Sequence, residues 1–480
     1  MKDRQGSDSG PRVHFTGSPA AWIACFAFLA ATQVAVALNG AFASALVPLT
    51  VLLLVAGGVW LLAVRSAASA PAPAWILAGA VGLRLIALAG DADLSDDPYR
   101  YAFEGALVVE GLDPYGPPPA DGARGAERAR WPTVAAGINH PEVRAAYPPL
   151  MQLSAAAVIA ARGGPEPAPE SLRALRLFYA LCDLACLAPL ALLAHLRGRS
   201  VARAWLAWGW CPVVCLAFGG TGHFDALAIL ACLGGLALWE QGRARSGAAR
   251  VGLDLAGGVL LGAGVLVKFL PVVALSGGTS FASWTRRAVT VALLTAGGLF
   301  VLPAWLGWSS PLSGGLHDYG LRWEASSILF RFVEPAFESG VFSAEGLLPV
   351  AGEADGTLTD PRRLARLTMG ALFALLLASN LTRRADATRA TAAALLGFVL
   401  LSPTLHPWYL TWPLATAAVV PLRAPLWLAA TAPALYWPLG AWATRGEWRE
   451  ASWLWPAVLL PGILLGLWDL WALRRTADDR

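Results

Sequence analysis

Long apolar runs recur along the whole chain and are separated by shorter polar segments. The runs extend over residues of about 20–38, 43–64, 72–90, 148–162, 174–195, 202–219, 224–240, 251–268, 270–284, 288–307, 363–380, 388–402, 406–421, 424–440 and 453–473. A helix of about 20 apolar residues matches the thickness of the hydrocarbon core of a bilayer. Because that core offers no water to backbone amides, the pattern predicts an all-α, polytopic transmembrane helix bundle of roughly 12–14 spans.

The composition agrees with a membrane protein. Hydrophobic residues make up 56% of the chain and charged residues 14%, and the mean hydropathy is +0.55. The net charge of +4 gives no reason to expect a nucleic acid partner. All six cysteines lie inside apolar runs, where a thiol packs as a small hydrophobic group, so we expect buried free thiols and no zinc site.

Basic residues gather in polar segments that the positive-inside rule places in the cytoplasm. These are residues 195–203, 241–250, 285–287, 381–389 and 474–480, together with the N-terminal tail. The expected divisions are a cytoplasmic tail at 1–19, N-terminal transmembrane helices at 20–90, an extracytoplasmic loop at 91–147, a transmembrane core at 148–307, a second extracytoplasmic loop at 308–362, C-terminal transmembrane helices at 363–473 and a cytoplasmic tail at 474–480. The expected location is the inner (cell) membrane, where the protein spans the bilayer many times.

One run conflicts with this count of crossings. If the residues on both sides of 148–164 lie outside, this run must enter and leave the membrane by the same face. The alternative is that the count of crossings is off by one. The run is short for a complete crossing, which favours a re-entrant or half-membrane helix.

Two adjacent carboxylates open the first outer loop, in "SDDPYRYAFEGALVVEG". Asp96 or Asp97 can cap a short helix that has Pro98 in its first turn and Gly111 as its stop, and that lies at the membrane surface. Capping accounts for one aspartate only. Because neighbouring carboxylates repel each other, the pKa of one should rise, which suits a general base or a cation-binding group.

Other polar residues on the outer side also suggest a working surface that faces away from the cytoplasm. Four of the six histidines, His140, His223, His317 and His406, fall on or beside the outer segments. A second interfacial helix is expected over residues 315–332, with Glu324 as its most interesting acid.

Lys268 stands at the end of an apolar run, where Pro271 prevents the helix from continuing. A cation costs about 2.5 kcal/mol or more in a membrane segment unless it snorkels or pairs, so Lys268 is a functional candidate. Its charge suits a phosphate. Arg84, close to the outer end of its apolar run, is a functional candidate for the same reason, although its position is less specific.

Six short segments, in order, resemble the GT-C superfamily of polytopic glycosyltransferases, especially the bacterial branch allied to polyprenyl-phosphate-mannose-dependent mannosyltransferases. They are "DDPYRYAFEG", "GLDPY", "INHPEVRAAYPPL", "GHFDAL", "VKFLP" and "SPTLHPWYL". In that superfamily an aspartate of the first large outer loop, four residues before an aromatic residue, is the usual catalytic base. Asp97 matches it, four residues before Tyr101, and Asp96 stays the alternative; the departures are Pro98 after the acid and Glu104 where Asp is more usual.

The resemblance implies a hexosyltransferase, with mannose expected, that moves a sugar from a polyprenyl-phosphate donor to an envelope lipid or glycan acceptor, with inversion. The expected donor-phosphate ligands are Lys268, His406, His223, Arg84 and Arg144. The expected substrate contacts are Glu104, Tyr101, His140, Tyr147, Asp225, Trp408 and Glu324. No cofactor is assigned, and a divalent cation stays open, although no ligand set with recognisable spacing is present. The competing interpretation is a transporter or flippase for a lipid-linked or anionic substrate, which the absence of a convincing internal repeat disfavours.

Overall fold

The computed structural model describes residues 18–39, 42–90, 94–278, 280–312, 314–339 and 360–478. Most of the predicted N-terminal tail, the end of the C-terminal tail and residues 340–359 of the second outer loop therefore lie outside the described residues. Within the described ranges every regular element is a helix, and extended pairing is limited to one β-bridge between Ala325 and Thr404. The all-α prediction is confirmed.

Among the described residues, seven helices are long and apolar enough to cross a membrane. They are α1 (Pro19–Leu38), α2 (Leu46–Arg65), α8 (Ala168–Ala185) continued by α9 (Leu187–Leu196), α13 (Gly247–Val267), α14 (Phe281–Ala296) continued through α15 (Leu302–Leu306), α18 (Pro361–Thr382), and Trp455–Arg475, which includes most of α23 (Leu460–Asp478). An eighth is counted if α10 (Val201–Gly209) and Pro212–Gly220, which begins with α11 (Pro212–Val214), form one span bent by 52°. Three shorter apolar helices are α3 (Pro73–Ala89), α7 (Pro149–Arg162) and α19 (Ala387–Leu401).

Part of the difference from the predicted 12–14 spans comes from runs that form continuous but short helices, namely α3, α7 and α19, and part comes from runs that are broken. The expected span 270–284 is a 3-10 helix, Leu270–Ser276, followed by the first residues of α14. The expected spans 406–421 and 424–440 are short helices rich in proline: Pro407–Leu410, α20 (Thr411–Ala417), α21 (Ala424–Thr431), Ala432–Tyr436 and α22 (Pro438–Arg445). Proline removes a backbone donor and ends a helix, which an apolar pattern alone does not reveal.

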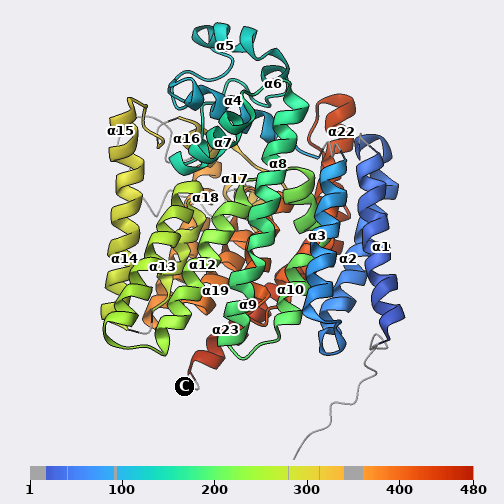
Figure 1. The fold of residues 1–480 in the computed structure, drawn as a ribbon, viewed down its shortest axis with the longest axis vertical. Coiled ribbons are helices and arrows are strands. Elements are labelled where there is room, and N and C mark those ends of the chain that lie inside the picture. Colours follow the sequence, from blue (N-terminus) through green and yellow to red (C-terminus); the bar gives the residue numbers. More distant parts are fainter. Residues whose placement is uncertain are drawn as a thin grey trace, which may run out of the picture.

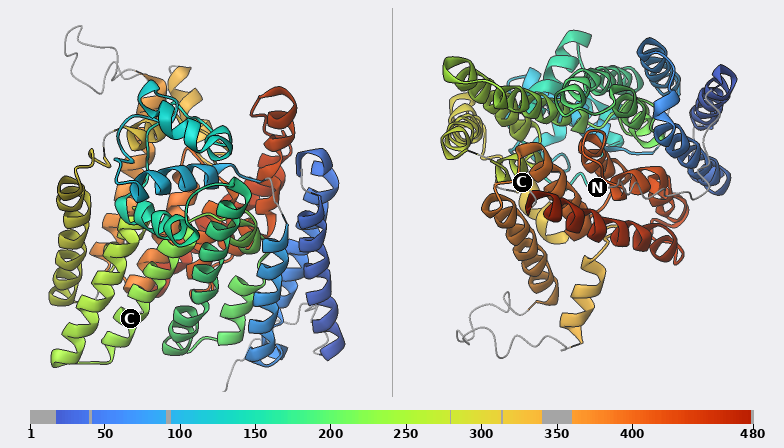
Figure 2. Two further views of the ribbon diagram at one scale, coloured as in Figure 1. Left: turned by 45° about the horizontal axis from the view of Figure 1, so that its top comes forward. Right: turned by 90° about the horizontal axis from the view of Figure 1, so that it is seen from below.

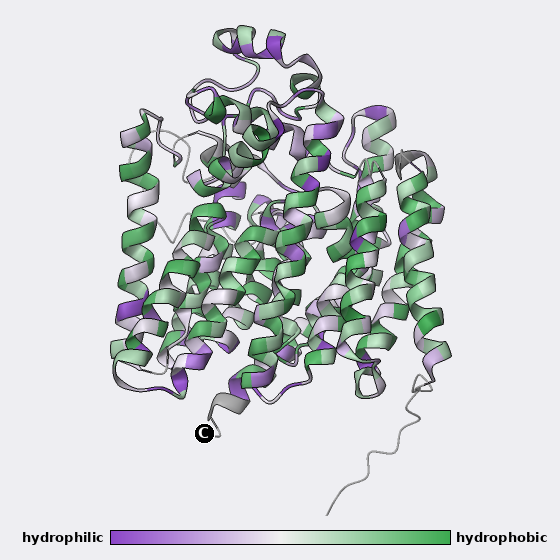
Figure 3. Cartoon of the chain, in the orientation of Figure 1, coloured by the Kyte–Doolittle hydropathy of each residue, from purple (hydrophilic) through white to green (hydrophobic). Residues whose placement is uncertain are grey.

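A hydrophilic layer covers one end of the bundle (Figures 1 and 3). It contains α4 (Asp97–Val109), α5 (Gly125–Arg130), α6 (Pro132–Ala136) and α16 (Gly315–Arg322), and it lies above mostly hydrophobic helices such as α12 (Asp225–Arg243). The prediction of one helix over residues 315–332 is wrong. α16 ends at Arg322, Trp323 is extended, and a second helix, α17 (Phe330–Glu338), begins at Phe330. The left view of Figure 2, in which the top of the molecule is turned forward, shows the same layer over the ends of the helices.

The segment α7 belongs to this layer at both of its ends. It packs along α4, and Glu166, four residues after the end of α7, accepts hydrogen bonds from the backbone amides of Thr133 and Val134 at 2.9 Å and 3.0 Å. The chain therefore returns to the layer from which α7 started. This agrees with the interpretation of residues 148–164 as a helix that enters and leaves by one face.

The predicted basic segments meet at the opposite end of the bundle. The Nη1 atom of Arg197 lies 3.2 Å from a carboxylate oxygen of Glu240 and 3.0 Å from one of Asp386, and Glu240 also pairs with Arg243. These residues come from three of the basic segments or their borders. The C-terminal helix ends at the same side in Figure 1.

Candidate active site

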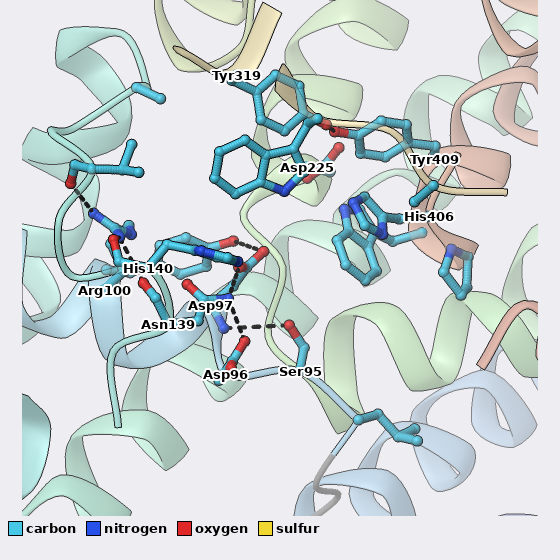
Figure 4. Close-up of a pocket in the computed structure, with 18 of the residues that line it drawn as sticks. Ser95, Asp96, Asp97, Arg100, Asn139, His140, Asp225, Tyr319, His406 and Tyr409 are labelled. Atoms are coloured by element: carbon cyan, nitrogen blue, oxygen red, sulfur yellow. Dashed lines mark hydrogen bonds between the residues drawn. The ribbon is translucent and has the colours of Figure 1, made fainter. Parts of the chain in front are cut away.

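A cavity of about 580 Å³ lies where the hydrophilic layer meets the bundle. Its walls come from the start of α4, the loop of residues 139–147, the start of α12, α16 and the segment 406–409. Asp97 and Lys268, which are 171 positions apart in the chain, both line it. Figure 4 shows the acids with Asn139 on one side of this cavity, and Asp225, His406 and Tyr409 on the other.

The acid side is built around the first turn of α4. Asp96 holds the N-cap position, but its side chain makes no capping bond to the helix. The side-chain amide of Asn139 donates to Asp96 Oδ1 at 2.5 Å and lies 3.5 Å from Asp97 Oδ1. The other oxygen of Asp97 accepts from the Tyr101 hydroxyl at 3.3 Å and lies 3.6 Å from Nδ1 of His223. Capping therefore does not explain either aspartate.

The pKa of Asp97 is raised to about 6. Burial is the largest cause of this rise, and the nearby charge of Asp96 is the second. The charge of Arg100 and the contacts to Asn139 and Tyr101 oppose this rise. A carboxyl group with a pKa near the working pH can take up a proton and release it again, which is the property that a general base needs.

The cation side is built around Lys268, the residue at which α13 ends. Its Nζ lies 2.7 Å from Asp225 Oδ1, which also accepts from the Trp412 indole at 2.7 Å. The ammonium lies 4.6 Å from the ring centroid of Tyr409 and 5.3 Å from that of Phe224. The second oxygen of Asp225 is buried and has no hydrogen-bond partner. Pro271, three residues after Lys268, prevents α13 from continuing past this residue.

Three aromatic rings connect the two sides. Trp408 stacks on His223 with ring centroids 3.7 Å apart and on His406 at 4.5 Å. His223 is fully buried, and its Nε2 has no hydrogen-bond partner. The structure thus places His223 beside Asp97, at the acid side of the cavity.

The outer rim is formed by residues of both predicted outer loops. The ring of His140 packs edge-on against Trp323 at 4.7 Å, and Glu324 pairs with Arg366 at 2.8 Å. Arg144 also lines the cavity. Tyr147 lies deeper, with its ring 4.5 Å from Phe224.

Three predicted site residues lie outside the cavity lining: His223, which is buried behind it beside Asp97, Arg84 and Glu104. Arg84 is buried in the bundle, where its Nε lies 2.7 Å from Asp183 Oδ2, so its charge is already matched by a protein carboxylate. Glu104 is a buried residue of α4 and accepts from Gln152 of α7 at 2.8 Å and from Arg100 at 3.4 Å. The side chain of His317 lies outside the described residues.

Three residues of the cavity, Asn139, Arg100 and Tyr319, were not predicted from the sequence. Asn139 is adjacent to His140 in the sequence. Its position gives no indication that its side chain contacts two carboxylates that lie 42 and 43 positions earlier. The hydroxyls of Tyr319 and Tyr409 hydrogen-bond to each other across the cavity. Such contacts depend on the tertiary fold and leave no periodic signal.

Among the described residues, no group of three or more His, Cys, Asp or Glu side chains is arranged so that it could hold a metal ion. A divalent cation therefore stays a prediction that the described residues do not test. The six cysteines are buried and free, as predicted.

An apolar wall completes the cavity. It is formed by Leu94, Leu435, Leu439, Trp442 and Trp448. Trp442 and Trp448 are 45% and 40% exposed, so this wall continues to the surface of the protein beside α22.

Comparisons with known proteins bear on what this cavity does. The family model described as "Alpha-(1->6)-mannopyranosyltransferase, N-terminal domain" matches residues 92–284, and the model described as "MptB C-terminal domain" matches residues 340–459. No curated protein matches the chain. The crystal structure of the Archaeoglobus fulgidus oligosaccharyltransferase complex with Zn and sulfate is similar at 12% identity and a TM-score of 0.32. The match covers 80% of this chain and 48% of that one, so the chain spans about half of that structure's length.

The two family models together cover more than half of the chain. Their segments include both aspartates of α4, Lys268 and the aromatic stack at residues 406–408. The predicted resemblance to glycosyltransferases is thereby confirmed, and the protein belongs to the alpha-(1->6)-mannopyranosyltransferase family of membrane glycosyltransferases.

Proposed function

We propose that this protein transfers a mannosyl residue from a polyprenyl-phosphate donor to an envelope lipid or glycan acceptor. The transfer takes place on the extracytoplasmic face of the inner membrane and inverts the anomeric centre. The observation that carries this proposal is the meeting of Asp97 and Lys268 in one cavity.

The two sides of the cavity suit the two halves of such a reaction. The acceptor oxygen forms a bond to the anomeric carbon while the bond from that carbon to the phosphate oxygen breaks. Asp97 takes the acceptor proton, and the phosphate leaves with the electron pair of the broken bond. A preorganised cation stabilises the charge that develops on the leaving phosphate, and Lys268, fixed by Asp225, is the residue for this role.

The position of the cavity supports the proposed side. It lies at the end of the bundle opposite to the cluster of Arg197, Glu240 and Asp386, where the basic segments meet. The positive-inside rule assigns that basic end to the cytoplasm. Because nucleotide sugars are cytoplasmic, a cavity at the other end calls for a lipid-linked donor. The apolar wall beside α22 offers a place for the lipid chain.

The test is an assay of the purified protein in detergent against a panel of polyprenyl-phosphate sugars, with mass spectrometry of the product. We expect transfer from the mannose donor. Asp97→Asn should lower the turnover about 10²–10⁴-fold, the usual contribution of a general base, with a smaller loss for Asp96→Asn. Lys268→Met should weaken transfer mainly by loss of leaving-group stabilisation.

The result that would overturn the proposal is equally concrete. Failure with every donor, with intact folded protein, would favour a transporter of a lipid-linked substrate. Transfer that persists at a normal rate in both aspartate variants would show that the assigned base is wrong.

A further inference from the structure

The two adjacent aspartates of the cavity have different surroundings. Asp96 accepts a short hydrogen bond of 2.5 Å from the Asn139 amide, whereas Asp97 lies 3.5 Å from the same nitrogen. Hydrogen bonding to a carboxylate favours its charged form. The amide therefore stabilises the charge of Asp96 much more than that of Asp97.

Arg100 fixes the loop that carries Asn139. Its Nη2 donates to the backbone carbonyls of Asn139 at 2.8 Å and His140 at 2.7 Å, and its Nη1 donates to that of Val143 at 3.0 Å. His140 has a left-handed backbone with φ of 45°, which is uncommon for a residue other than glycine and needs support from its surroundings. Arg100 lies on α4, one turn after Asp96, so the same helix that carries the acids holds the loop against them.

Arg100 is itself held from below. Its guanidinium is largely buried and lies 3.4 Å from Glu104, which accepts from Gln152 of α7 at 2.8 Å. The contacts run from α7 through Glu104 and Arg100 to the loop and then to the acids. This gives Glu104 a position in the site's support, in place of the substrate contact that the sequence suggested.

We propose that Asn139, held in place by Arg100, is a positioning residue that keeps Asp96 ionised beside Asp97, so that Asp97 becomes the stronger base of the two. The inference rests on the proposed function, in which Asp97 takes the acceptor proton. A charged neighbour disfavours a second negative charge, so an ionised Asp96 makes Asp97 bind a proton more readily. Without the amide, Asp96 would share the proton and weaken that effect.

The other ionisable groups that face Asp97 come from several elements. They are Arg100 and Tyr101 of α4, Tyr147 before α7, His223 before α12 and Tyr319 of α16. None of them changes in the variants at positions 96 and 139, so differences between these variants report on the aspartate pair.

The experiment is a double-mutant cycle of Asn139→Ala and Asp96→Asn in the full-length protein, with transfer measured from pH 5 to pH 9. If Asn139 acts through Asp96, the double variant should be no slower than the slower single variant. Asp96→Asn should move the acidic limb of the rate profile to lower pH. Asn139→Ala should replace the single limb by two steps, because the two carboxyl groups then share the proton.

Losses that multiply in the double variant, or a wild-type acidic limb in Asn139→Ala, would overturn the inference. Arg100→Lys provides a second route in case Asn139→Ala does not fold. This substitution keeps the positive charge but loses the planar guanidinium that donates to three backbone carbonyl groups of the loop, so it should give the same two-step profile. Glu142→Gln, an exposed change on the same loop outside the cavity lining, is the control and should keep the wild-type limb.

The failure of this inference can be told from failure of the proposed function. If Asp97→Asn is inactive but Asn139→Ala behaves like the wild type, the proposed function stands and the role of Asn139 is wrong. If Asp97→Asn remains active, the base itself is wrong.

Discussion

At the scale of single residues, the chemistry of the cavity depends on how burial changes the ordinary behaviour of an acid. An aspartate in water is fully ionised at neutral pH. Asp97 is enclosed by α4, Tyr101 and His223, and its charged form loses hydration that the protein replaces only in part. The fold therefore gives the Asp97 carboxyl group a proton affinity that its residue type alone does not reveal.

This enclosure predicts the pH dependence of transfer. The pKa of Asp97 is raised to about 6, and only the carboxylate form can take the acceptor proton. The value of kcat/KM should therefore be constant above this pH and fall about tenfold for each unit below it, as the carboxyl group becomes protonated. The measurement is the initial rate of transfer from pH 4.5 to pH 8 at low donor concentration. An acidic limb near pH 4 would show that Asp97 is not the group that titrates.

At the scale of elements, the two outer loops are locked together above the cavity. Asp113 accepts from the backbone amide of Ser309 at 2.8 Å, and the ring of Tyr115 packs against Trp308. A Cβ atom on Gly315, at the start of α16, would lie 2.1 Å from the carbonyl oxygen of Arg144. The cavity wall that α16 provides thus depends on close backbone contact with the first loop.

We predict that Gly315→Ala displaces α16 and lowers transfer at least tenfold, with a higher KM for the substrates, because a backbone atom cannot move aside as a side chain can. Gly320→Ala on the same helix is the matched control, since nothing lies within 4 Å of the added Cβ. The measurement is transfer kinetics of both variants. Equal activity of the two would show that α16 does not need its present position.

Much of this level of structure could be predicted from the sequence, and the reasons for the remainder are physical. The start of α4 beside Pro98, the end of α13 before Lys268 and the membrane helices follow from proline positions and apolar length. The joining of Asp97 to Lys268 in one cavity was indicated by the resemblance alone. The contacts of Asn139 and the ion pair of Arg84 depend on which helices pack together, and a single sequence carries no local signal for that.

At the scale of the whole molecule, buried arginines fasten the bundle where its helices break. Arg84 of α3 makes a two-atom contact with Asp183 of α8, at 2.7 Å and 3.1 Å, and also donates to the carbonyl of Gly209 at the end of α10. Arg176 donates to the carbonyls of Gly90 and Gly219 at 2.6 Å and 3.0 Å. These bonds satisfy carbonyl groups that lose their helical partners at each break.

We therefore predict that Arg84 acts on stability and not on donor binding. Arg84→Met should destabilise the protein by about 3–5 kcal/mol, because it leaves Asp183 as an unpaired buried charge. Arg84→Met/Asp183→Leu should recover most of this loss, since an apolar pair of similar volume avoids that charge. Thermal unfolding in detergent checks this, with Arg130→Ala, an exposed ion-pair residue, as the near-neutral control. If Arg84→Met instead raised the KM for the donor and left the stability unchanged, Arg84 would belong to the donor site.

For the proposed lipid-linked donor, the apolar wall that runs from the cavity to the surface beside α22 has a consequence for how one donor molecule replaces another. Removing a polyprenyl chain from the bilayer into water would cost about 0.8 kcal/mol for every CH2 group, which soon exceeds the energy that a binding site can return. When the headgroup enters the cavity laterally, along the apolar wall, the polyprenyl chain stays among the neighbouring lipids throughout. Successive donors then arrive by two-dimensional diffusion, and the supply of substrate depends on its density per unit area of membrane.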